Sequence, residues 1–200
     1  EEYAKDIGND VRLRYISKAY FKYQDNLLKS NAMDFDDLIY NTVRLFEENV
    51  DILQYYRDCI KYILVDEYQD TNPAQYMMVK LLVEESRNIC VVGDDDQSIY
   101  KFRGATIENI LSFEKQYIGA RVIRLEQNYR STQSILNAAN AVIAHNKGRK
   151  GKVLWTANEA GDPIVVYEAS DEGTEANYVV SQIIAASKDS GFKDHAILYR

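Results

Sequence analysis

Residues 62–72 read Tyr-Ile-Leu-Val-Asp-Glu-Tyr-Gln-Asp-Thr-Asn, so a short apolar run leads directly into two adjacent carboxylates. Such a run is typical of a strand buried in a parallel sheet, whose carboxyl end faces a ligand crevice. Asp66 is placed there to hold hydrated Mg²⁺, and Glu67 to orient an attacking water. Taken alone, this segment fits a strand ending in solvated acids equally well.

A second junction between a strand and a polar loop follows at residues 89–105, which begin Ile-Cys-Val-Val-Gly-Asp-Asp-Asp-Gln. Between the two junctions, Asn72 and Pro73 are typical of the N-cap and the first position of a helix. The order strand, helix, strand predicts a βαβ unit with parallel strands. We therefore expect the acidic pair and Gln97 at the same edge of one sheet.

Composition limits the class of protein. The chain has 200 residues, of which 46% are hydrophobic, and this is enough for a sizeable core. No segment approaches the long uncharged run of a membrane span, and we expect a soluble, cytoplasmic protein. Cys59 and Cys90 lack metal-ligand spacing, so buried thiols are favoured over zinc ligands or a disulfide.

The net charge of −7 argues against a nucleic-acid partner, because phosphate contacts are normally made by Lys and Arg. Basic residues nevertheless gather locally, at Lys101 with Arg103 and in the run 147–152, and local potential steers a strand more than total charge does. For the run 147–152, a solvated turn and a DNA contact both remain open.

Further elements follow from apolar periodicity and capping residues. We expect helices over about 6–28, after Asp34, after Thr106, after the cap Ser131 and over 174–187. Strands are expected at 121–125, 153–155, 164–167 and 196–199. This order is α/β, and a chain that stops in a strand suggests a piece of a longer protein. The sequence has no Gly-x-x-x-x-Gly-Lys-Ser/Thr loop, so either that loop lies upstream or the acidic site is not a phosphate site.

Four blocks, in order, resemble the motifs of UvrD/Rep-type superfamily 1 DNA helicases: residues 34–39, 65–72, 93–105 and 125–132. The resemblance covers almost the whole chain. It implies a partial RecA-like parallel sheet with flanking helices and an N-terminal helical segment. Residues 1–30 would end an inserted helical subdomain, 31–127 would be the later part of a first RecA-like ATPase domain, and 128–200 the start of a second.

The resemblance also implies roles at the nucleotide. Asp66 would be the Mg²⁺ ligand, and Glu67 the catalytic carboxylate, also near the metal. Gln97 would sense the γ-phosphate, Arg130 would be an arginine finger and Tyr129 would stack on adenine. The alternatives are a turn cap for Gln97, a structural salt bridge for Arg130 and core packing for Tyr129.

Tyr100 and Phe102 are the residues implied to stack on bases of single-stranded DNA. Arg103 would link this segment to hydrolysis and reach the nucleotide site. Many relatives carry Trp where this chain has Phe102, so the stacking area is smaller here. The alternative for Phe102 is a buried side chain.

The implied activity is ATP-dependent 3′ to 5′ unwinding of DNA, with ATP and Mg²⁺ as cofactors and single-stranded and partly duplex DNA as partners. The 200-residue chain alone is expected to be inactive because it lacks the phosphate loop. Two alternatives are a subunit of a helicase-nuclease of recombination repair and a non-catalytic DNA-binding module.

Overall fold

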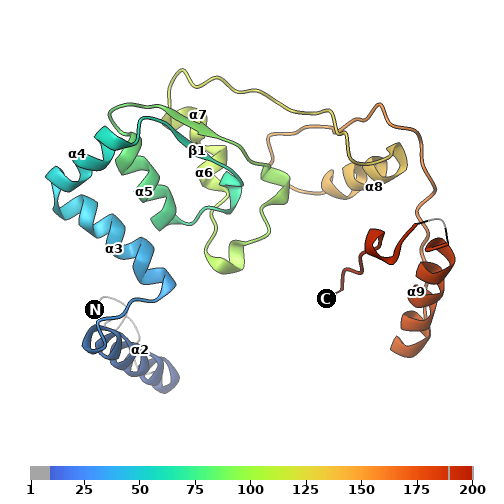
Figure 1. Ribbon diagram of the computed structural model, residues 1–200, viewed down its shortest axis with the longest axis horizontal. Coiled ribbons are helices and arrows are strands. Elements are labelled where there is room, and N and C mark those ends of the chain that lie inside the picture. Colours follow the sequence, from blue (N-terminus) through green and yellow to red (C-terminus); the bar gives the residue numbers. More distant parts are fainter. Residues whose placement is uncertain (1–9, 189, 200) are drawn as a thin grey trace. The chain divides into compact units, whose positions relative to one another are not determined.

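The computed structural model describes residues 10–188 and 190–199 (Figure 1). The chain divides into two compact units. The first holds the described residues up to Leu125 together with Ile143–Lys152, and the second holds Glu126–Val142 and the described residues from Val153 onward. The segment Ile143–Lys152 therefore belongs to the first unit, although its neighbours along the chain on both sides belong to the second.

The first unit begins with helices whose starts are fixed by capping side chains. Helix α2 (Val11–Lys29) follows Asp10, whose carboxylate accepts hydrogen bonds from two backbone N–H groups of the first turn. The predicted residues 6–9 of this helix lie outside the described residues. Helix α3 (Phe35–Glu48) starts at the predicted cap Asp34, which forms a capping box with Asp37.

Helix α4 (Val50–Cys59) was not predicted as a separate element. It begins directly after Asn49, the residue that ends α3, and Asn49 makes no side-chain capping bond to it. Asn49 and Asp51 are residues typical of a helix start, but the Asn49 amide donates to the Leu45 carbonyl of α3, so α4 begins without a side-chain cap. Its last turn is held by Arg57, which donates at 2.9 and 2.7 Å to the carbonyl of Leu81 in the neighbouring helix.

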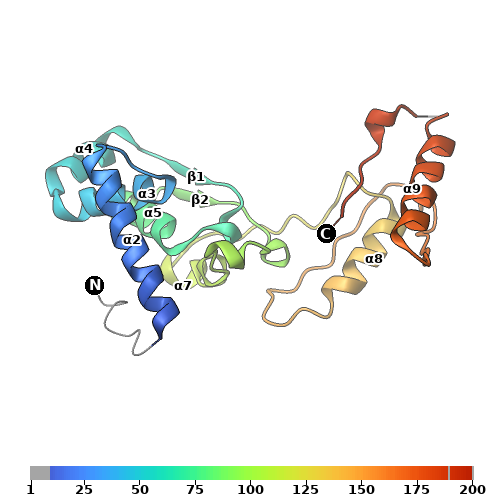
Figure 2. The same ribbon diagram turned by 90° about the horizontal axis from the view of Figure 1, so that it is seen from below.

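The sheet contains two parallel strands, β1 (Ile63–Val65) and β2 (Ile89–Val91), with Ile63 opposite Ile89. Helix α5 (Pro73–Val83) connects them, and Asn72 caps it in a capping box with Gln75. The predicted βαβ unit, with parallel strands and a connecting helix, is confirmed. Helices α3, α4 and α5 pack against one another beside these strands (Figure 2).

The two faces of this small sheet differ in burial. Ile63 and Val65 are half-buried, whereas Leu64 and its partner Cys90 on the other face are exposed. Side chains alternate along a strand, and no described element covers the face that carries Leu64. The prediction of buried thiols is therefore wrong for Cys90, and also for Cys59, which lies at the exposed end of α4.

After β2 the chain forms short turns of 3₁₀ helix and two single-turn helices, α6 (Glu108–Leu111) and α7 (Phe113–Gln116). The helix predicted after Thr106 is thus broken at Ser112, whose hydroxyl donates to the carbonyl of Glu108. Phe113 meets the buried Tyr68 edge to face, with ring centroids 5.8 Å apart. This contact closes the core beneath the acidic pair.

The second unit contains helices α8 (Gln133–Ile143) and α9 (Glu172–Ala186). The last residue of α8, Ile143, is assigned to the first unit. Asp171 caps α9. Ser131 was predicted to cap α8, but it does not. The first N–H groups of α8 instead donate to the carbonyls of Glu159 and Ala160. A neighbouring backbone segment can thus satisfy a helix start in place of a capping side chain.

The strands predicted at 121–125, 164–167 and 196–199 do not form, and that at 153–155 is reduced to a single parallel bridge between Gln127 and Trp155. An apolar run becomes a strand only where a second strand takes up its backbone N–H and C=O groups. Among the described residues no such strand lies beside these runs, and their apolar side chains, such as Val166 and Leu198, are exposed. In the described part of the chain, no helix is long and apolar enough to cross a membrane.

Candidate functional site

The acidic pair directly follows β1, as predicted, and both side chains are exposed. Asp66 accepts a hydrogen bond from the backbone N–H of Glu67 through Oδ1, at 2.9 Å. Glu67 has a φ of 49°, a left-handed conformation that costs a residue with a side chain of order 1–3 kcal/mol. It is held there because the next N–H, of Tyr68, donates to Val92 at 2.9 Å. The surrounding fold thus imposes a strained backbone at the predicted catalytic carboxylate.

Gln69 joins this pair to the loop after β2. It is buried, and its Nε2 donates to Glu67 Oε2 at 2.8 Å, while its Oε1 accepts from the Asp94 N–H at 2.9 Å. Sequence reasoning did not single out Gln69. The available signal was an amide in a strongly acidic run, at a position where a carboxylate would repel its neighbours.

Gly93 permits this link. A Cβ atom at this position would lie 2.6 Å from Gln69 Oε1 and 2.8 Å from the side chain of Ile110. Both distances are shorter than van der Waals contact allows, so any larger residue would push Gln69 away from the loop.

Gln97 ends the short 3₁₀ turn Asp95–Gln97 and is exposed. Its Nε2 donates to Asp94 Oδ2 at 2.8 Å, and Asp94 is in turn ion-paired with Lys152. Burial opposes ionisation of Asp94, but the hydrogen bonds from Lys152, Gln97 and the Asp96 N–H outweigh it and hold the pKa of Asp94 below its usual value. Glu67 and Gln97 are therefore joined indirectly, through Gln69 and Asp94.

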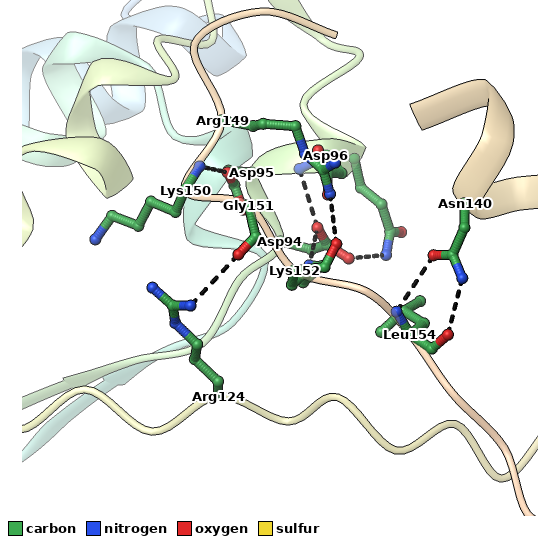
Figure 3. Close-up of polar contacts among 11 residues, drawn as sticks. Asp94, Asp95, Asp96, Arg124, Asn140, Arg149, Lys150, Gly151, Lys152 and Leu154 are labelled. Atoms are coloured by element: carbon green, nitrogen blue, oxygen red, sulfur yellow. Dashed lines mark hydrogen bonds and ion pairs between the residues drawn. The ribbon is translucent and has the colours of Figure 1, made fainter. Parts of the chain in front are cut away.

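Residues 94–96, here called the acidic loop, bind residues 149–152, here called the basic turn (Figure 3). Arg149 pairs with Asp96 at 2.6 Å, and the Lys150 N–H donates to Asp95 Oδ2 at 2.7 Å. Together with the Lys152–Asp94 pair, these contacts engage all three carboxylates of the loop. The basic turn is thus an ion-paired element of the first unit, and the three carboxylates already have cationic or N–H partners.

Tyr100, Phe102 and Arg103 form an exposed group on the turn Lys101–Arg103. Phe102 is 79% exposed, so the alternative of a buried ring is wrong. The Arg103 guanidinium lies 5.3 Å from the centroid of the Tyr100 ring and 5.5 Å from that of Phe102. Two aromatic faces and a cation are thus presented together, a combination suited to nucleic-acid bases.

The loop that carries Tyr129 and Arg130 belongs to the second unit, whereas Asp66, Glu67 and Gln97 belong to the first. Asn128 Oδ1 accepts from the N–H groups of Arg130 and Ser131 at 2.9 and 2.8 Å. Both predicted side chains are exposed, and the Arg130 guanidinium makes no hydrogen bond or ion pair to a described residue. The loop is therefore held by hydrogen bonds from its backbone N–H groups to the Asn128 side chain, while the two predicted side chains are exposed.

Sequence comparison identifies the family. The chain matches the UvrD/REP helicase N-terminal domain over residues 1–118 and the UvrD-like helicase C-terminal domain over residues 123–200. The chain therefore belongs to the UvrD/REP helicase family, as its four sequence blocks indicated.

Among curated relatives, the chain is 54% identical over its full length to the ATP-dependent DNA helicase PcrA of Staphylococcus epidermidis. It is 52% identical, over 98% of its length, to that of Staphylococcus aureus. The chain spans 27% of the length of each. Within the family, the chain is thus similar to PcrA helicases.

Proposed function

We propose that this chain is part of an ATP-dependent DNA helicase that moves 3′ to 5′ along one strand. The observation that carries the proposal is the pairing of two loops at the ends of parallel strands. Through Gln69, the loop with Asp66 and Glu67 is bonded to the loop that bears Gln97. The relatives named above are ATP-dependent DNA helicases, which supports this reading.

In this proposal residues 1–30 end an inserted helical subdomain, residues 31–127 are the later part of one RecA-like domain and residues 128–200 start another. The parallel pair β1–β2 and its crossover helix support a RecA-like sheet. Because the proposed substrate is bacterial DNA, we expect a cytoplasmic location.

The exposed carboxylates suit a hydrated magnesium ion, which prefers oxygen ligands and keeps several of its waters. Asp66 would hold the ion and Glu67 would accept the proton of the attacking water. When bound, Mg²⁺ neutralises charge on the phosphates. Gln97 would hydrogen-bond the γ-phosphate without adding charge, and Arg130 would donate its planar fork to the same group.

The other roles rest on exposed side chains. Tyr129 offers a free ring face to adenine, and Tyr100 and Phe102 offer theirs to bases of single-stranded DNA. Arg103, which lies over both of these rings, would couple the DNA segment to the nucleotide site. Conformational changes driven by ATP binding and hydrolysis would then move DNA.

The test is ATP hydrolysis, with and without single-stranded DNA, by a full-length protein that carries these residues, by its Glu67→Gln variant and by the 200-residue chain. We expect DNA-stimulated turnover in the first and none in the other two. No turnover in the full-length protein would favour the non-catalytic DNA-binding module. ATP-dependent degradation of DNA would favour the helicase-nuclease, and turnover by the short chain would contradict its proposed inactivity.

A further inference from the structure

Gln69 is a polar residue with 1% of its surface exposed, and both ends of its side-chain amide are used. Its Nε2 donates to Glu67 Oε2 at 2.8 Å and its Oε1 accepts from the backbone N–H of Asp94 at 2.9 Å. We propose that Gln69 is a positioning residue that fixes the Glu67 carboxylate relative to the Gln97 loop. This inference rests on the proposed function, because it gives Glu67 the role of catalytic carboxylate.

The two partners leave Gln69 only one useful orientation. The carboxylate of Glu67 can only accept, and the backbone N–H of Asp94 can only donate. A flipped amide would therefore set oxygen against carboxylate and nitrogen against N–H, losing both bonds. An amide is the only common side chain of this length that donates at one end and accepts at the other without carrying charge.

Neighbouring groups fix Gln69 itself. Its backbone carbonyl accepts from the Ser98 hydroxyl at 3.3 Å, which ties it to the residue after Gln97. Gly93 leaves the space that Oε1 occupies. The left-handed backbone at Glu67 turns its side chain so that the residue two positions later can reach it. These contacts come from both strand ends, so a shift of either loop would move Glu67 relative to Gln97.

Loss of the hydrogen bond from Gln69 to Glu67 should lower the rate of turnover more than it weakens the binding of ATP. Groups that orient reactive side chains typically contribute ten- to a hundredfold to activity. We expect Gln69→Met, which keeps the length of the side chain, to lower kcat for DNA-stimulated ATP hydrolysis by at least about tenfold, with KM for ATP changed far less.

Gln69→Glu separates the two bonds. Its carboxylate can still accept from the Asp94 N–H, but it can no longer donate to Glu67 and places a second acid beside it. Gln69→Glu should therefore lower kcat at least as far as Gln69→Met does, again with KM for ATP changed far less, a split that a merely structural defect would not cause.

Asn109→Asp is the matched control. Asn109 is also buried, and its amide donates to Thr71 Oγ1 at 3.1 Å, without contact to Glu67. The same change from amide to acid should leave kcat close to the wild-type value. All variants are made in a full-length protein that carries these residues, with Glu67→Gln as the inactive reference.

Unchanged kcat in both Gln69 variants, beside an active wild type, would overturn this inference alone. An equal loss of kcat in Asn109→Asp, or loss of folding in both Gln69 variants, would assign Gln69 a structural role and overturn it as well. Absence of turnover in the wild type would instead overturn the proposed function and the inference together.

Discussion

Arg149 and Asp96 form an ion pair in which Nη2 lies 2.6 Å from Oδ2, and the side chains are only 20% and 7% exposed. The same Nη2 also donates to the carbonyl of Lys152 at 2.9 Å. Asp96 Oδ1 and Arg149 Nε have no hydrogen-bond partner among the described residues. The ion pair is thus short and direct, but two of its buried polar atoms lack hydrogen-bond partners. It therefore fixes the position of the loop more than it adds stability.

Removing one partner should therefore cost more than removing both. Arg149→Met leaves Asp96 buried and unpaired, and we expect the acidic loop to be destabilised by about 3 kcal/mol. The double variant Asp96→Leu with Arg149→Met should recover most of this loss, because no uncompensated charge remains. Hydrogen exchange of the peptide covering residues 89–98 measures the local effect.

Lys147→Met provides the control, since Lys147 is an exposed residue of the same basic run. It should leave exchange at residues 89–98 unchanged. A double variant that is less protected than Arg149→Met would contradict the argument from unpaired charge.

Asp94 should make the acidic loop sensitive to acid. Its hydrogen bonds lower its pKa in the folded state, so its ionised form stabilises the loop above the ordinary aspartate pKa of about 3.9. This stabilisation is lost as the pH falls from there through the lowered value. Loop protection in the wild type should exceed that in Asp94→Asn at pH 6, and this difference should shrink as the pH falls below about 3.9. A difference that stays constant over this range would exclude Asp94 as the titrating group.

The sequence predicted the parts of the fold that depend on neighbouring residues. Asp34, Asn72 and the apolar run before Asp66 determine local structure through caps and strand propensity, and each formed as expected. The cap predicted at Ser131 failed because its role was taken by carbonyls of residues 159–160, distant along the chain.

Contacts between distant residues also explain what was missed at the site. The bond from Gln69 to Asp94 and the docking of the basic turn on the acidic loop join segments that no periodicity connects. The predicted strands at 164–167 and 196–199 have suitable composition, but a strand depends on its partner as much as on its own residues.

Gly93→Ala tests the close approach beside Gln69. The added methyl group would overlap Gln69 Oε1 and Ile110, so the variant should lose the Asp94–Gln69 bond and be destabilised by about 1–3 kcal/mol. Exchange of the Asp94 amide and thermal unfolding measure the two effects. Gly191→Ala is the control, because its φ is −77° and its nearest neighbour would be 3.5 Å away. Equal destabilisation by both changes would show that overlap with Gln69 and Ile110 is not responsible, because the entropy that the unfolded chain loses on replacing Gly by Ala favours the folded state.

Phe102 should contribute to DNA binding through the area of its ring. Phe102→Ala should weaken binding of single-stranded DNA by about 1–3 kcal/mol, and Phe102→Trp should strengthen it. Fluorescence anisotropy with a labelled oligonucleotide measures both, at one fixed salt concentration. The ring is exposed, so neither change should alter thermal stability. Equal affinity of the three proteins would remove Phe102 from the proposed DNA surface.

The side-chain oxygen of Asn128 should by itself fix the conformation of the loop that carries Arg130. That oxygen accepts from two backbone N–H groups, of Arg130 and Ser131, and Asn158 supports the same loop by donating to the Ser131 carbonyl at 3.1 Å. Asn128→Asp keeps an acceptor of the same shape, whereas Asn128→Leu leaves both N–H groups without it.

We therefore expect Asn128→Leu to lower DNA-stimulated ATP hydrolysis in a full-length protein by on the order of tenfold, and Asn128→Asp to retain most of it. In a protein that already carries Arg130→Ala, Asn128→Leu should have little further effect, because the activity that Asn128→Leu removes depends on the position of Arg130. Additive losses in the double variant would show that Asn128 acts on turnover by another route.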